Sequence, residues 1–120
     1  MMIDMKANYV AAHSFTPQTI TGNTPGSAVD LDGCERGFAV LSVGAVSGFT
    51  SLDVALKESD TAGGVYAALP VPVAFPQVTA ASKVHVVNLR PSKRYVRAEP
   101  TLVGTNAVVT VTVLGLRKNV

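Results

Sequence analysis

Beta-branched residues dominate this sequence and limit the folds open to it. Valine occurs 20 times and threonine 11 times among 120 residues. Both side chains are stiff about χ1 and favour a pleated, half-buried surface over a helix. Ten glycines and seven prolines also interrupt the chain, at intervals too short for ordinary helices. The sequence therefore predicts an all-β, single-domain antiparallel β-sandwich of about eight strands.

Alternating apolar positions indicate where the strands lie. Residues 38–43 are apolar on nearly both sides, which is typical of a central strand, whereas residues 52–57 have one apolar side. Other strands are expected near residues 9–15, 18–21, 27–31, 65–69, 84–89, 94–99 and 107–116. Turns are expected at 22–26 and 104–106, a small and flexible segment at 44–51, and a long excursion at 70–82, where three prolines occur. The predicted core contains Val40, Val54, Val109, Val111 and Val113.

The length and composition predict one domain with its own core. Apolar residues make up 48% of the chain and charged residues 15%, far from the composition of disordered chains. We divide the chain into an N-terminal arm or first strand, residues 1–15, and a β-sandwich domain, residues 16–120. No apolar run approaches the roughly 18 residues of a membrane-spanning helix. Because Asp4, Lys6 and Asn8 interrupt the N-terminus, we expect no signal peptide, no membrane partner and synthesis in the cytoplasm.

Residues suited to catalysis or metal binding are few and scattered. The single cysteine, Cys34, excludes an internal disulfide, and His13 and His85 are too few for most metal sites. Two groups of carboxylates, Asp30 with Asp32 and Asp53 with Glu58 and Asp60, lack the spacing of a calcium loop and fit turns and edge strands better. No nucleophile elbow, zinc-binding helix or phosphate loop occurs. We therefore expect no enzyme activity, no catalytic residue, no metal and no cofactor.

Charge is distributed unevenly along the chain. Residues 83–120 contain seven basic side chains and one carboxylate, whereas residues 1–82 contain three basic and seven acidic side chains. A basic stripe with Tyr95 between Arg94 and Arg97 could bind nucleic-acid phosphates. Aromatic residues make up only 6% of the chain, however, so polar positions on half-exposed strands explain the pattern better. We do not expect a nucleic-acid partner, and an acidic protein surface stays open as a partner of this region.

The first residues are apolar but show no period that would bury them in their own domain. Met1, Met2, Ile3 and Met5 are of this kind, and methionine adapts well to an irregular partner surface. An edge strand or arm of this type can add to the sheet of a neighbouring protein. The candidate contact residues are Met1, Met2, Ile3, Met5, Tyr9, Arg94 and Arg97.

Several segments together resemble one family. They are residues 38–44, the pattern L-x-V-x-L-x-E-S-D at residues 52–60, K-R-Y-V-R at residues 93–97, and the valine-rich strand that ends at residues 114–118. In these segments the chain resembles the small head decoration, or cement, proteins of tailed bacteriophages and prophages. The resemblance covers residues 38–118. Residues 1–37 match nothing as clearly, so capsid-contacting residues are not carried over.

This resemblance implies a jelly-roll-like fold and a place in the virion. The chain would bind the major capsid protein on the outer surface of the capsid and stabilise the mature head. A homo-oligomer, dimer or trimer, is also expected, because a sandwich with so few charges would otherwise expose apolar edges. The alternative is a carbohydrate- or receptor-binding β-sandwich module of a phage tail or fibre. The absence of tryptophan argues against that alternative, because sugar sites usually offer exposed aromatic platforms.

Overall fold

A computed structural model of the chain describes residues 9–117, and this part is built from antiparallel strands. The six strands are β1 (Tyr9–Ile20), β2 (Val29–Asp30), β3 (Cys34–Ser59), β4 (Ala67–Ala74), β5 (Lys83–Leu89) and β6 (Tyr95–Arg117). Residues 9–117 contain no helix, and hence none that could cross a membrane. The predicted all-β, antiparallel class is confirmed.

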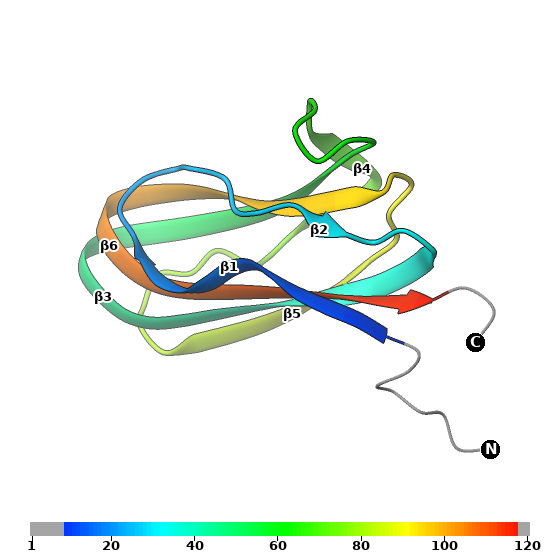
Figure 1. The fold of residues 1–120 in the computed structure, drawn as a ribbon. Coiled ribbons are helices and arrows are strands. Elements are labelled where there is room, and N and C mark those ends of the chain that lie inside the picture. The colour runs from blue at the N-terminus through cyan, green and yellow to red at the C-terminus, as the bar shows by residue number, and fades with distance from the viewer. Residues whose placement is uncertain (1–8, 118–120) are drawn as a thin grey trace, which may run out of the picture.

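The two longest strands, β3 and β6, pair along almost their whole length and bend together (Figure 1). Their pairing shifts register between Val43 and Val46 and again between Phe49 and Ser51. Glycines with positive φ occur at this bend, Gly48 at 61° and Gly104 at 109°. The flexible segment predicted at 44–51 and the hairpin turn predicted at 104–106 are therefore wrong, because both lie within continuous strands. Because glycine and bulges bend a strand without ending its pairing, two pairs of predicted strands merge into β3 and β6.

The bend divides the sheet into two layers, which Figure 1 shows stacked on each other. In the first layer the strand order is β1, β6, β3, β5, because β1 pairs with the second half of β6 and β5 with the first half of β3. In the second layer the order is β2, β6, β3, β4, built from the other halves of β3 and β6. Each layer therefore has two central strands and two edge strands.

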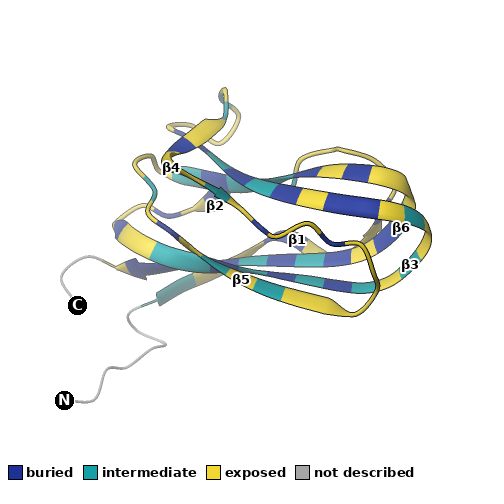
Figure 2. Ribbon diagram, turned by 180° about the vertical axis from the view of Figure 1, so that it is seen from behind, coloured by how far each residue is buried: buried dark blue, intermediate teal, exposed yellow. Residues whose placement is uncertain are grey.

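The core lies between the two layers. Buried and exposed residues alternate along β3 and β6 (Figure 2), as the period of a strand requires. The buried set includes Leu41, Val54, Val96, Val109, Val111 and Val113. Four of the five predicted core valines are thus confirmed. The prediction for Val40 is wrong, because its position along β3 points it away from Ala39 and Leu41 to the outer side of the first layer, where it is half-buried.

Two edge strands contain prolines in their interior instead of ending at them. The sequence predicted separate strands before and after Pro17, yet β1 continues through it with register shifts between His13 and Phe15 and between Phe15 and Gln18. In the same way β4 contains Pro70 and Pro72, so the predicted excursion begins only after this strand. An edge strand needs hydrogen bonds on one side alone, and it therefore tolerates a residue without an N–H.

Candidate functional site

Apart from Arg36 near the start of β3, the outer side of the first layer contains no Lys, Arg, Asp or Glu at its outward positions. These positions follow from the register, in which Val40 of β3 lies opposite Thr112 of β6 and Val86 of β5. The surface, which we call the uncharged face, is formed by Ala11 and His13 of β1, Thr110, Thr112 and Leu114 of β6, Phe38, Val40 and Ser42 of β3, and Val84, Val86 and Asn88 of β5. Charged residues adjoin it at its margin, at Arg36, Lys83 and Arg90.

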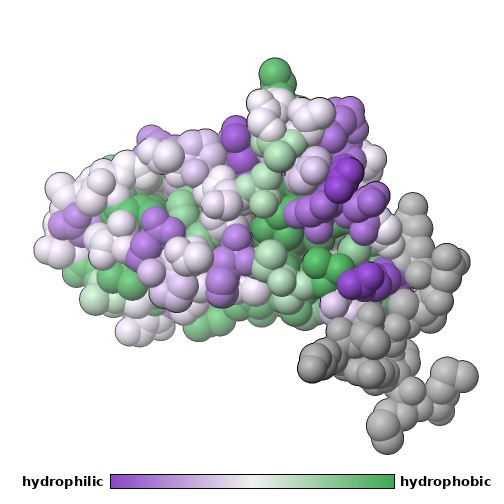
Figure 3. Space-filling model, viewed as in Figure 1, coloured by the Kyte–Doolittle hydropathy of each residue, from purple (hydrophilic) through white to green (hydrophobic). Residues whose placement is uncertain are grey.

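Large apolar side chains on this face are open to solvent. Val84 is 63% exposed and Val86 is 60% exposed, and Phe38 and Leu114 are half-buried. Tyr9 packs edge-on against Phe38, with ring centroids 6.2 Å apart. In Figure 3 hydrophobic residues gather along part of the lower margin, where Figure 1 places β5 and the first half of β3. A contiguous exposed apolar surface with hydroxyl groups and few charges is typical of a surface that binds a protein.

The outer side of the second layer is charged. Its outward positions include Asp53 and Lys57 of β3 and Arg97 and Glu99 of β6, and we call this surface the charged face. Arg97 Nη2 lies 2.9 Å from Glu99 Oε2, and the Arg97 guanidinium stacks 3.9 Å from the centroid of the Tyr66 ring. Both contacts use Arg97 within the chain.

Arg94 is also paired within the chain, at the edge of the charged face. Its Nη2 lies 2.8 Å from Asp30 Oδ2, and its guanidinium lies 5.1 Å from the centroid of the Tyr95 ring. The hydrogen bond from Arg94 and that from the backbone N–H of Asp32 lower the pKa of Asp30 to about 2. The same ion pair raises the pKa of Arg94. The ion pair therefore ties the end of β2 to the residue that precedes β6.

The structure does not bring the predicted contact residues together. Tyr9 lies at the uncharged face, whereas Arg94 and Arg97 lie on the opposite side of the molecule. Met1, Met2, Ile3 and Met5 lie outside the described residues. The residues that sequence reasoning missed are Phe38, Val40, Val84, Val86 and Leu114. The sequence signal for this surface was the apolar character of residues 38–43 on both sides of the strand. It predicted a central strand that its own domain covers on both sides, and the exposed side was therefore missed.

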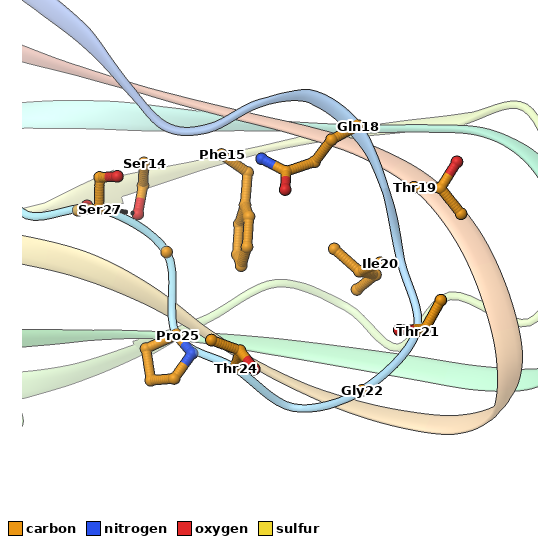
Figure 4. A pocket seen from close by; sticks show the side chains of 11 residues that line it. Ser14, Phe15, Gln18, Thr19, Ile20, Thr21, Gly22, Thr24, Pro25 and Ser27 are labelled. Atoms are coloured by element: carbon orange, nitrogen blue, oxygen red, sulfur yellow. Dashed lines mark hydrogen bonds between the residues drawn. The ribbon is translucent and has the colours of Figure 1, made fainter.

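An open cavity of about 290 Å³ lies between β1 and the loop that follows it. Figure 4 shows Phe15 and Ile20 pointing into this space, with Pro25 across from them. Its other lining residues are hydroxyl, amide and glycine residues, and none titrates near neutral pH. Ser14 Oγ already donates to Ser27 O and accepts from the N–H of Ala98, so it is not free to act as a nucleophile. The cavity offers no acid–base chemistry.

The remaining reactive groups are held in structural contacts. The buried Glu58 carboxylate accepts hydrogen bonds from Ser92 N (2.8 Å), Ser92 Oγ and Lys93 N (3.3 Å), and so fixes the turn between β5 and β6. Asp53 accepts from Gln77 Nε2, and burial raises the pKa of the Cys34 thiol. Within residues 9–117, no three His, Cys, Asp or Glu side chains lie close enough to hold a metal ion.

Comparison with known proteins identifies a shared fold. No family model matches the chain, and no curated protein matches its sequence. Twenty-three chains of solved structures do match. One of them is the crystal structure of the SPBc2 prophage-derived protein YomS, with a TM-score of 0.56 and 12% identity over 90% of this chain and 94% of that chain. The two proteins are thus similar in fold over nearly their whole lengths.

Proposed function

We propose that this chain is a structural protein of a tailed-phage virion, a cement or decoration protein that binds the outer surface of the major capsid protein lattice and stabilises the mature head. The observation that carries the proposal is the uncharged face, which spans all four strands of one layer. The prophage origin of YomS, a protein of similar fold, supports a phage origin for this chain. The family resemblance in residues 38–118 supports the choice of the capsid as its partner.

We also propose that the two layers form a jelly roll. When β3 and β6 are each counted as two strands across the bend, each layer contains four antiparallel strands. One long bent pair supplies the four central strands, and β1, β2, β4 and β5 supply the four edges. Two packed four-stranded sheets of this kind are the architecture of jelly rolls, many of which build viral capsids.

A face without charged side chains is well suited to a closely packed contact that is repeated at every subunit of the capsid lattice. Burying a charged side chain costs free energy unless a partner pairs with it, so a face without Lys, Arg, Asp or Glu loses little on docking. On a closed lattice every copy meets the same capsid surface, and an oligomer that spans two subunits gains from a second, intramolecular contact. A modest single interface would then give stable attachment.

The charged face is less suited to the alternative role in sugar or receptor binding. Its two tyrosine rings, Tyr66 and Tyr95, are both in contact with guanidinium groups, those of Arg97 and Arg94. A sugar would have to displace these cations to stack on the rings. Screening the purified chain on a glycan array tests this role, and we expect no specific binding.

Two matched lysine substitutions test the proposed binding face. Ala11 and Thr101 are both exposed on strands, Ala11 on the uncharged face and Thr101 on the charged face. Ala11→Lys should weaken binding to purified mature heads that lack this protein by about tenfold or more, because the new ammonium group must lose its water. Thr101→Lys should bind like the wild type. Co-sedimentation with the heads measures both, and equal binding by the two variants would reject the uncharged face as the binding surface.

A further inference from the structure

The two layers have four edge strands, and three of these carry features that discourage pairing with another chain. The edge strand β1 contains Pro17 and two register shifts. The edge strand β2 has only two residues, and β4 contains Pro70 and Pro72 with a register shift in its pairing to β3. Short strands, prolines and bulges are the usual means by which proteins protect sheet edges from association.

The fourth edge strand, β5, has none of these features. Its seven residues pair with residues 37–43 of β3 without a register shift, and among the described residues it pairs with no other strand. No proline interrupts it, and no charged residue lies between Lys83 and Leu89. A regular, unprotected edge presents a row of backbone N–H and C=O groups that can pair with a further strand.

We propose that β5 pairs with β5 of a second copy of this chain, antiparallel about a two-fold axis at Val86. The two first layers would then form one continuous sheet of eight strands, and the two uncharged faces would join into one surface. The inference goes beyond the proposed function, because it concerns self-association and holds whatever the uncharged face binds.

The residues of β5 are compatible with this antiparallel self-pairing. With Val86 at the axis, Val84 lies opposite Asn88, His85 opposite Val87, and Lys83 opposite Leu89. Arg90, just beyond the strand, falls opposite Ser82, so no two like charges lie directly opposite each other. A parallel, in-register pair would instead place Lys83 opposite Lys83, which is unfavourable. The distribution of charge therefore selects the two-fold arrangement.

Apolar surface beside the free edge also favours a second copy. A hollow of about 280 Å³ lies where β4 passes the end of β5, and it is lined by Val71, Val73, Asn88, Leu89 and Arg90. In the two-fold arrangement, Lys83 of the second copy lies opposite Leu89 of the first copy, and its side chain is therefore next to this hollow. The aliphatic part of a lysine side chain can cover such a surface while its ammonium group stays in water.

A pair of charge variants tests the two-fold contact. Val86 is 60% exposed, so Val86→Lys and Val86→Glu should both fold, which circular dichroism checks. The wild type should sediment as a dimer, and each variant alone should sediment as a monomer at the same concentration, because identical charges meet at the axis. An equal mixture of the two variants should form a dimer again, because opposite charges then meet. Val103→Lys and Val103→Glu, at a 49% exposed valine of β6, should remain dimers.

Three results would overturn the inference: a monomeric wild type, charge variants that dimerise as the wild type does, or a mixture that stays monomeric. The first would leave β5 free for an extended segment of another protein, and the second and third would mean that the copies associate through a different contact. Head binding separates this inference from the proposed function. A dimer that does not bind heads would reject the proposed function alone, and a monomer that does bind them would reject the dimer alone.

Discussion

Ser14 joins the two layers through its side-chain hydroxyl. It belongs to β1 of the first layer, and it is 3% exposed. Its Oγ donates to Ser27 O over 2.9 Å and accepts from Ala98 N, in the second layer, over 2.8 Å. A buried polar group that loses its partner keeps the cost of its desolvation, so this small contact has a large effect on stability.

Replacing Ser14 should therefore destabilise the fold. Ser14→Ala leaves the Ala98 N–H and the Ser27 carbonyl without this partner, and the free energy of unfolding should fall by about 1 to 3 kcal/mol. Urea denaturation measures the change. Ser27→Ala is the control, because the Ser27 side chain is exposed and its backbone makes the contacts with Ser14. Equal losses in the two variants would contradict this role of Ser14.

Asp30 links stability to pH. Its pKa in the folded chain is about 2, compared with an ordinary value of 3.8, so its ionised form stabilises the folded state above the ordinary pKa. That contribution is lost as the pH falls through the interval from 3.8 to about 2. Asp30→Asn should have a lower thermal midpoint than the wild type at neutral pH, and the two midpoints should converge across this interval. A difference in thermal midpoint that persists unchanged at the acid end of this pH interval would show that Asp30 stabilises the fold without its charge.

At the scale of the elements, the bend in β3 and β6 decides the fold. Gly104 has a φ of 109°, a backbone conformation that other residues rarely adopt. A Cβ atom at this position would collide with the carbonyl oxygen of Gly48 and with Phe49 Cα. The two strands thus approach each other too closely at the bend for any side chain at residue 104.

Gly104→Ala should consequently weaken the bend and with it the contact between the layers. We expect a loss of about 1 to 3 kcal/mol in the free energy of unfolding, the usual cost of a residue held in a disfavoured backbone region. Gly22→Ala provides the comparison, because no atom lies within 4 Å of the position of its added Cβ. If both variants unfold at the same denaturant concentration, the bend does not depend on Gly104.

The alternation of apolar and polar residues predicted which side chains of a strand face the core, but not where the strands begin and end. The apolar side chains at alternate positions of residues 107–116 and 52–57 face the core, as their period indicated. The period indicates this correctly because successive side chains of any strand point to opposite sides. The merging of these segments into β6 and β3 depends on pairing between distant residues, such as Val54 with Pro100. Glycine occurs both in turns and at bends within strands, so local sequence does not distinguish the two.

The candidate site was predictable to a smaller extent. A strand that is apolar on both sides, such as residues 38–43, is covered on both sides in its final assembly, but its sequence does not say whether its own domain or another protein covers the second side. Arg94 appeared available because its partner, Asp30, is 64 residues away in the chain, and only the folded arrangement shows that the two are paired. The partner of Arg97, Glu99, lies two residues away on the same side of the strand, so the sequence already contained that pair.

The whole molecule has two unlike outer faces. One layer presents valine, phenylalanine, leucine and threonine outward, and the other presents Asp53, Lys57, Arg97 and Glu99. Such a division is compatible with a protein whose one side is covered in the assembled particle while the other side meets water. The proposed function therefore requires the uncharged face to be the covered side.

Electron cryo-microscopy of mature heads to which the purified chain has been added determines this orientation directly. We expect added density on the shell into which the structure fits with β1, β6, β3 and β5 of the first layer against the capsid protein. Asp53, Lys57, Arg97 and Glu99 should then face the solvent. A fit with the charged face against the shell, or heads that gain no density at saturating protein, would contradict the proposed function.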